Sequence, residues 1–184
     1  SRPRIELWLP GRPKGRRRGL GVNEAMPEGF HTLVVRASPR AVWEFVREME
    51  NWARLLPGFQ GLVKIDDRES LWTVRGDLGV VSRVVELRVH ITESIEPSKV
   101  CFRLQGTNEN VTGGGTFRAA SASDSSATLE FQLALEAGGT MGAMVNALMV
   151  PVLPRLVAGF AETIGREIEK QYREPRARGE TSSP

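Results

Sequence analysis

Apolar residues recur every three or four positions from Thr140 to Tyr172, and this spacing predicts one long helix near the C-terminal end of the chain. At a rise of about 1.5 Å per residue, about 30 residues form a rod roughly 45 Å long, enough to cross a whole sheet. Its apolar stripe must be buried against other elements. The stripe contains Val145, Leu148, Met149, Val152, Leu156, Phe160, Ile164 and Ile168.

Two prolines fall inside this helical pattern. Pro151 and Pro154 remove backbone donors, so we expect a kink or a brief interruption near Met149–Pro154. Two interpretations remain open. The bend follows a curved sheet, or it is a hinge that lets Met141–Val150 swing off a cavity mouth together with the loop of residues 52–59.

From Gly61 the apolar period changes to two and stays near two for about 75 residues. Clusters of turn residues divide this stretch into about six strands of an antiparallel meander. Alternation places charged residues such as Glu86, Glu130 and Glu136 on the outer face. The predicted inner face carries Trp72, Val74, Leu87, Val89, Phe102, Leu104, Phe117, Phe131 and Leu133.

The folded part opens with a β-branched segment at residues 30–37, which predicts a first strand. Ser38 suits a helix N-cap and Pro39 suits the first helical position, so a helix should run to about Glu50. A second short helix at residues 51–56 should end before Pro57. The order predicts an α+β fold in which two short helices follow the first strand and a curved antiparallel sheet wraps around the long C-terminal helix.

Length and charge divide the chain into three parts. At 184 residues, with 40% hydrophobic and 26% charged residues, the chain suits one domain. Residues 1–18 hold seven basic residues and one Glu, which gives them a net charge of +6. Because the whole chain has a net charge of +3, the remaining residues together carry −3. We therefore expect a disordered basic extension at residues 1–29, a folded domain at 30–172 and a flexible polar tail at 173–184.

Residues that could support metal or covalent chemistry are few. The single Cys101 cannot form an intramolecular disulfide, and with only His31 and His90 beside it we expect no metal site, no cofactor and no catalytic set. The Gly113–Gly115 run lacks the strand-then-helix context of a phosphate-binding loop. We interpret these glycines as positions that let the sheet bend.

Several segments, in this order, resemble the START-like helix-grip (SRPBCC) superfamily, and most of all its carbon monoxide dehydrogenase CoxG family. They are SPRAVWE at residues 38–44, WARLLPG at 52–58, LWTVRGDLG at 71–79, GGGTF at 113–117, and Gly138-Gly139 before a helix that contains Asn146. The resemblance covers residues 30–170. It implies a helix-grip fold with a deep apolar cavity between sheet and C-terminal helix. In the namesake family it also implies an accessory role for a membrane-associated molybdenum hydroxylase.

Binding of an apolar small molecule in this cavity is the function we expect, since the inward set is nearly all apolar. Isoprenoid quinones, fatty acids and sterol-like rings all remain open as ligands. A cyclase, aromatase or dehydratase on the same fold is the second interpretation, and an assembly or docking subunit without a ligand is the third. The expected ligand-binding residues are Trp52, Leu55, Leu56, Trp72, Val74, Leu87, Val89, Phe102, Leu104, Phe117, Phe131, Leu133, Met144, Leu148, Met149, Val152, Leu156 and Phe160.

The basic N-terminal extension has two open interpretations, a merely solvated tail or a contact with a charged partner. Clustered Arg residues bind phosphates of lipids or nucleic acids, but the remainder of the chain is acidic, so we do not expect a nucleic-acid partner. Trp8 between Leu7 and Leu9 favours a membrane or protein contact. We expect a cytoplasmic protein at the inner membrane face, with an anionic membrane surface and an oxidoreductase as candidate partners.

Overall fold

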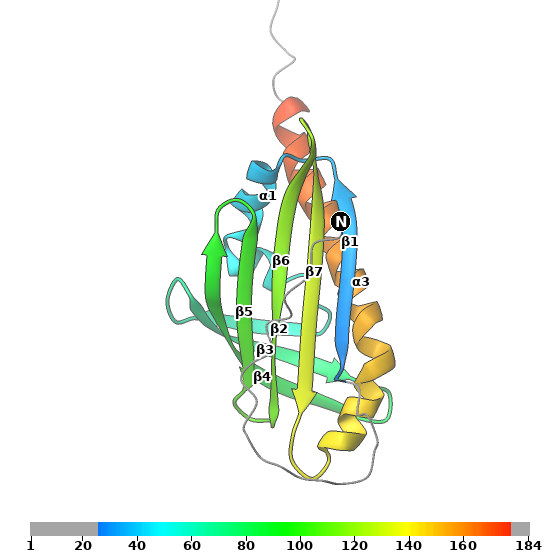
Figure 1. Ribbon diagram of the computed structural model, residues 1–184. Coiled ribbons are helices and arrows are strands. Elements are labelled where there is room, and N and C mark those ends of the chain that lie inside the picture. Colours follow the sequence, from blue (N-terminus) through cyan, green and yellow to red (C-terminus); the bar gives the residue numbers. More distant parts are fainter. Residues whose placement is uncertain (1–25, 178–184) are drawn as a thin grey trace, which may run out of the picture.

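The computed structural model describes residues 26–177, and within them seven strands form one antiparallel sheet in the order β1-β7-β6-β5-β4-β3-β2. Two short helices follow the first strand and a long helix ends the domain (Figure 1), so the predicted helix-grip fold is confirmed. The elements are β1 (Glu28–Val35), α1 (Pro39–Val46), α2 (Met49–Ala53), β2 (Phe59–Lys64), β3 (Glu69–Asp77), β4 (Ser82–Ile95), β5 (Lys99–Gly106), β6 (Val111–Ser123), β7 (Ser126–Ala137) and α3 (Gly142–Ala177).

Helix α1 begins where the sequence predicts it. The side-chain oxygen of Ser38 accepts a hydrogen bond from the Ala41 backbone N–H at 3.2 Å, and Pro39 occupies the first turn. Val42, Phe45 and other apolar residues of α1 are buried. Helices α1 and α2 therefore close one end of the sheet, beside the last turns of α3 (Figure 1).

The pairing register confirms the predicted alternation of inner and outer residues. Residues directly opposite one another in an antiparallel pair lie on the same face. The inner face joins Trp72 to Leu87, Val89 to Leu104, and Phe117 to Phe131. The outer face joins Thr73 to Glu86 and Arg118 to Glu130.

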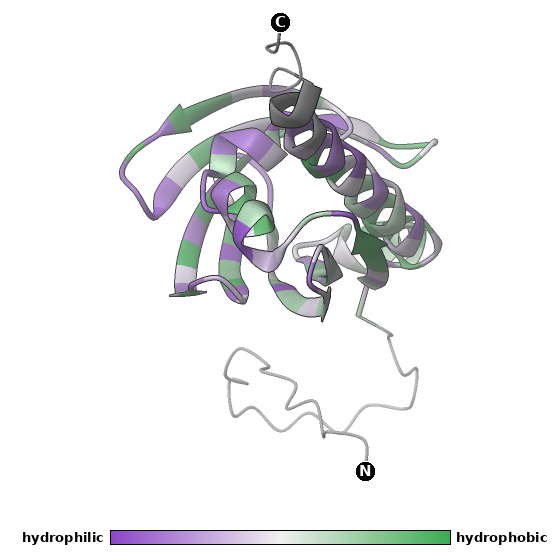
Figure 2. Cartoon of the chain, turned by 90° about the horizontal axis from the view of Figure 1, so that it is seen from above, coloured by the Kyte–Doolittle hydropathy of each residue, from purple (hydrophilic) through white to green (hydrophobic). Residues whose placement is uncertain are grey.

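Helix α3 lies along one flank of the sheet and packs on β1 and β7 (Figure 2). It is continuous from Gly142 to Ala177, so the interruption expected near residues 149–154 does not occur. Pro151 and Pro154 are both exposed on the helix. The carbonyl groups that they leave without a helical donor can therefore bond to water.

The deeply buried stripe of α3 differs in part from the predicted one. Met149, Ile164 and Ile168 are buried as expected, whereas Val145, Leu148, Val152, Leu156 and Phe160 are half-buried. In their place Leu153, Val157 and Ala161 are buried. The strongly apolar composition of this helix obscured its phase, because residues on several sides satisfied the same spacing.

The limits of the domain differ by a few residues from the expected ones. Strand β1 begins at Glu28 instead of residue 30, and α3 extends past Tyr172 to Ala177, into the segment expected to be a flexible tail. Most of the basic extension, residues 1–25, and residues 178–184 lie outside the described part of the chain.

Candidate functional site

Several large apolar side chains face the interior of the domain but are only half-buried. A half-buried side chain keeps part of its surface within reach of a water-sized sphere, so most of these residues pack against the core without being fully enclosed. We call this set the inner surface. It contains Leu62, Leu87, Phe102, Phe131, Leu133 and Leu135 from the sheet, and Val152, Leu156 and Phe160 from α3.

The buried residues around the inner surface fall into two groups. Ile164 and Ile168, from the second half of α3, belong to the main core cluster with residues of α1, α2 and the sheet. Met149, Leu153 and Val157, from the first half, are buried but lie outside that cluster. The main core cluster therefore includes the α1 and α2 end of the domain, and the buried residues of the first half of α3 lie apart from it.

Aromatic rings form much of the wall at the packed end. The rings of Trp52 and Trp72 meet edge to face with centroids 5.0 Å apart, and Phe102 lies 5.8 Å from Trp52. Phe117 and Phe131 make a second edge-to-face pair at 5.0 Å. Such pairs hold their rings in fixed orientations, so the wall has a defined shape.

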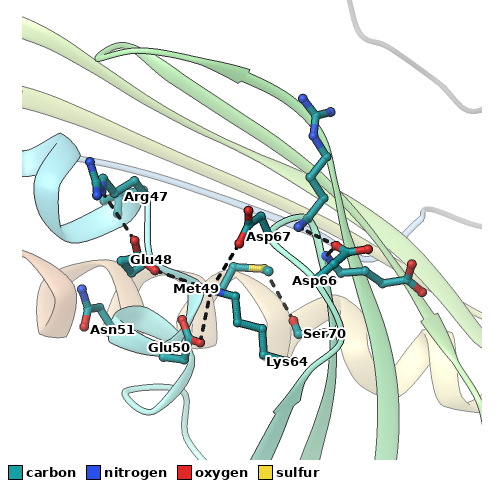
Figure 3. A network of polar contacts seen from close by, with 12 residues as sticks. Arg47, Glu48, Met49, Glu50, Asn51, Lys64, Asp66, Asp67 and Ser70 are labelled. Atoms are coloured by element: carbon teal, nitrogen blue, oxygen red, sulfur yellow. Dashed lines mark hydrogen bonds and ion pairs between the residues drawn. The ribbon is translucent and has the colours of Figure 1, made fainter.

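The polar atoms of this wall are already bonded within the protein. The indole N–H of Trp52 donates to the Val46 carbonyl at 3.0 Å, and that of Trp72 donates to the Ser70 hydroxyl at 2.7 Å. Ser70 is fully buried and donates in turn to the Met49 sulfur at 3.5 Å (Figure 3). The wall therefore offers a ligand mainly apolar contacts.

Ser70 was not among the residues predicted to matter. Its signal in the sequence is its spacing of two from Trp72, which places both side chains on the inner face. Lys64, at the end of β2, has its Nζ 3.9 Å from carboxylate oxygens of Glu48 and Glu50 and 3.7 Å from one of Asp67, and so links α2 to the sheet (Figure 3). These exposed pairs contribute little stability individually.

The glycines of β6 leave space for neighbouring side chains of the inner surface. Gly115 lies opposite Phe102, and a Cβ atom at Gly115 would be 2.5 Å from Cζ of that ring. A Cβ atom at Gly113 would likewise be 2.7 Å from a methyl carbon of Leu135. These glycines thus let neighbouring side chains lie across β6, a role that adds to the bending predicted from the sequence.

Asn146 fixes the start of α3 on the end of β7. Its side-chain oxygen accepts from the Ala137 N–H at 2.8 Å, and its side-chain nitrogen donates to the Ala137 carbonyl at 3.0 Å. The adjacent β5–β6 loop bonds to the same turn, because the Gly138 N–H donates to the Asn110 carbonyl at 2.8 Å. The first half of α3 is therefore anchored at its beginning.

The structure places the predicted ligand-binding residues at three depths. Buried are Trp52, Trp72, Val74, Val89, Leu104, Phe117 and Met149. Half-buried are Leu55, Leu56, Leu87, Phe102, Phe131, Leu133, Leu148, Val152, Leu156 and Phe160. Met144 is exposed and shares a side of α3 with Arg155 and Glu162, which points it to solvent instead of to the inner surface. Leu62 and Leu135, which were not predicted, belong to the inner surface.

Titratable groups with specific partners lie at the β1 edge of the inner face, where His31 is opposite Phe131, and on the outer face. Nε2 of His31 is 2.8 Å from a carboxylate oxygen of Glu162, a contact that joins the edge strand β1 to α3. On the outer face, hydrogen bonds from Lys99, at 2.6 Å, and from Cys101 lower the pKa of Glu93. The stability from this lowered pKa is present above the ordinary carboxyl pKa and is lost as the pH falls through the folded-state value. Within residues 26–177 no three His, Cys, Asp or Glu side chains come together as a metal site would require.

Solved structures of low sequence identity share this fold. The Zhui aromatase/cyclase from Streptomyces sp. R1128 is 17% identical with a TM-score of 0.63, and the match covers 84% of this chain and 99% of that one. A START superfamily protein from Mycobacterium smegmatis is 18% identical with a TM-score of 0.58, covering 78% of this chain and 98% of that one. At these identities the likeness establishes the fold alone.

Sequence comparison identifies the family. No curated protein matches the sequence closely enough to count as a relative. The family of the carbon monoxide dehydrogenase subunit CoxG matches residues 32–169, which extend from within β1 to within the last turns of α3. This match covers most of the described domain, including every strand that contributes to the inner surface. The chain therefore belongs to the carbon monoxide dehydrogenase CoxG family.

Proposed function

We propose that this protein binds and carries an apolar small molecule, lipid-like or quinone-like, on the inner surface between the sheet and α3. The observation that supports the proposal most directly is that Leu87, Phe102, Leu133 and their neighbours face inward yet remain accessible. A soluble domain that leaves apolar side chains accessible inside itself loses the stabilisation that their burial would give. A ligand that covers them recovers it.

The chemistry of the walls favours recognition by size and shape. The indole N–H groups of Trp52 and Trp72 are bonded within the protein, so they do not select a polar ligand group. Each ligand CH₂ group removed from water contributes about 0.8 kcal/mol, so affinity should rise with chain length until the space is filled. Typical sites of this kind hold roughly 300–1,000 Å³.

Family membership supports a specific setting for this carriage. We infer that the ligand serves a membrane-associated molybdenum hydroxylase of the carbon monoxide dehydrogenase type, with this protein as its accessory subunit. In this setting the cytoplasmic face of the membrane is the place of action. The oxidoreductase would receive the ligand from the protein or return it.

Thermal melting with candidate ligands tests the binding proposal. Long-chain quinones and fatty acids should raise the melting temperature, because a ligand at 100 times its dissociation constant adds about 2.7 kcal/mol of stability. Phe131→Trp enlarges an inner-surface residue and should weaken this shift with modest loss of stability. Phe30→Trp is the matched control, since Phe30 is an exposed residue on the outer face of β1 and should leave the shift unchanged.

Two results would contradict the proposal. One is the absence of a shift with every apolar ligand, combined with a loss of about 1–3 kcal/mol in Phe131→Trp, which is the cost of overpacking a solid core. The other is turnover of a polyketide-like substrate, which would indicate an enzyme of the cyclase or aromatase kind. A stable complex with an oxidoreductase that forms without any ligand would favour the docking subunit.

A further inference from the structure

The segment before the domain contains an apolar run, Leu7-Trp8-Leu9, followed by a strongly basic stretch. Residues 10–18 hold five basic residues and no acidic one, a net charge of +5. Both features lie outside residues 32–169, which match the family, so family membership implies no role for them. Three consecutive large apolar side chains gain free energy when an apolar surface removes them from water. The question is therefore which surface of this protein they could reach.

The segment enters the domain on the inner face of the sheet. Pro27 is fully buried, and its carbonyl accepts a hydrogen bond from the Leu135 N–H at 3.0 Å. Two residues later, Gly29 lies opposite Leu133 in the register of β1 with β7. Leu133 and Leu135 both belong to the inner surface. The chain therefore enters the domain beside apolar side chains that remain accessible.

The apolar run is close enough in the chain to reach the whole inner surface. A Cβ atom at Gly29 would be 2.6 Å from a methyl carbon of Val157, so β1 packs tightly on this turn of α3. Leu156, from the same turn, belongs to the inner surface. The sixteen residues 10–25 span at most about 55 Å when extended, whereas the first half of α3 is only about 27 Å long. Leu7-Trp8-Leu9 can therefore reach every part of the inner surface from this entry point.

Charge at this entry point is complementary to the basic stretch. Figure 1 shows the start of β1, the end of β7 and the first turns of α3 together at one end of the domain, opposite α1. The strand ends and turns here contain four carboxylates and one Arg, a net charge of −3, and Glu28, Asp77 and Glu136 among them are exposed. We call them the acidic strand ends, and they comprise residues 28, 77–83, 106–112 and 136–142. They attract the +5 stretch to the end at which the segment joins the domain.

We propose that Leu7-Trp8-Leu9 occupies the inner surface when no ligand is bound, while the basic residues of 10–18 lie against the acidic strand ends. The segment is then an internal competitor of the ligand, an inference that rests on the proposed binding of an apolar molecule at this surface. A second apolar set, Met141, Met144 and Val150, is exposed on the α3 flank of the domain. Entry of the chain on the inner face favours the inner surface over this flank.

The competition requires only a weak contact. A segment on a short tether has an effective concentration on the order of 1 mM at its site, so an intrinsic dissociation constant of about 0.5 mM keeps it bound about two-thirds of the time. Because only the unoccupied third of the molecules can accept ligand, the apparent affinity falls about threefold. A threefold change corresponds to about 0.7 kcal/mol, so the melting of the domain should hardly depend on the segment.

Photo-cross-linking of the full chain tests the contact without a ligand. The photoreactive residue p-benzoylphenylalanine replaces Trp8, which lies before the domain, so the change spares the core. Irradiated protein is digested, and the cross-linked residues are identified by mass spectrometry. We expect cross-links within one chain to the inner surface, for example to Phe102 or Leu133. Cross-links confined to the α3 flank or to the outer face of the sheet overturn the proposal, as do cross-links only between chains or none at all.

Fluorescence titration with dansyl-undecanoic acid tests the competition. Leu7→Ser with Leu9→Ser should bind this probe about threefold more tightly than wild type, because the competitor is weakened. The matched control is Leu20→Ser with Val22→Ser, which removes two apolar side chains at the same spacing from the same segment, changes no charge and should bind as wild type does. Equal affinity of all three proteins overturns the proposal, and so does equal tightening in both variants. If the probe binds none of them, the proposed carriage is wrong, and the cross-linking result alone then decides whether the segment occupies the inner surface.

Discussion

At the scale of single residues, depth within the domain distinguishes the inner surface from the core. Val89 and Leu87 alternate on one strand and face the same side, yet Val89 is buried and Leu87 is half-buried. Both side chains point to the inner face, so the difference in burial arises from the neighbouring elements that cover each of them. Alternation in a sequence therefore finds the inward residues without showing which of them a ligand could reach.

Gly115 is a residue at which this space is sensitive to substitution. A Cβ atom there would lie 2.4 Å from the Gln132 carbonyl oxygen and 2.5 Å from the Phe102 ring. Because one of these atoms is backbone, Gly115→Ala should destabilise the domain by about 1–3 kcal/mol and displace Phe102. Urea unfolding measures the loss.

Gly61→Ala is the control for this prediction. Gly61 is also in a strand, but a Cβ atom there would have no atom within 4 Å. It should unfold close to wild type, or slightly above it because alanine restricts the unfolded chain. If the two variants have equal stability, the close packing of Phe102 on β6 is wrong.

The sequence anticipated the inward residues well and their contacts poorly. Periodicity of two placed Trp72, Phe102 and Phe131 on the inner face, because each strand is long enough to fix its phase. It could not show that Ser70 accepts the Trp72 N–H, or that Gly115 makes room for Phe102. The first contact depends on the side-chain conformations of two residues on one strand, and the second depends on the register between β5 and β6. Neither was in the pattern.

At the scale of elements, α3 is one continuous helix whose two halves differ in the distribution of apolar residues. Its second half has an ordinary amphipathic pattern, and there the predicted Ile164 and Ile168 are the residues that are buried. Its first half is apolar on several sides, so spacing alone did not distinguish Leu153 from Val152. The sequence therefore predicted the existence of the helix and the buried face of one half, but not of the other.

The exposed prolines of α3 lead to a prediction about this element. The helix is continuous through Pro151 and Pro154, so we expect them to permit a passive bend. Replacing both by alanine should stabilise the domain by about 1 kcal/mol or more, because alanine is the better helix former and restores two N–H donors. Ligand association and dissociation rates, followed by stopped-flow fluorescence of the tryptophans, should stay at their wild-type values.

A change of either rate in this double variant would have a different meaning. Faster or slower ligand release at unchanged affinity would indicate that Met141–Val150 opens as a hinged lid over the inner surface. Thr140→Ala, just before the helix, is a useful reference because it alters an exposed residue near the same end without touching the prolines. A rate change shared by both variants would point to the turn and not to a hinge.

At the scale of the whole molecule, the protein separates an apolar interior, an apolar flank and a basic segment. The charge of +6 in residues 1–18 is offset by −3 over the remainder. Composition foretold this separation, since it is a property of the sequence. The position of β1 beside α3 could not be foretold, because it depends on the pairing of β1 with β7, which follows much later in the chain.

The last prediction concerns the basic segment itself. Because β1 begins at Glu28 and Gly29 packs on α3, a deletion must end at Ala25 to spare the domain. The chain lacking residues 1–25 should melt like wild type but bind anionic vesicles more weakly at low salt, since each Lys or Arg near such a surface contributes about 1 kcal/mol. Raising the salt should weaken wild-type binding toward that of the deleted chain, because salt screens the charges and leaves apolar contact intact. Full-length protein with the seven basic residues of 1–18 changed to Gln should behave as the deletion does. Binding that is unchanged by the deletion across the whole salt series would contradict a role for these charges.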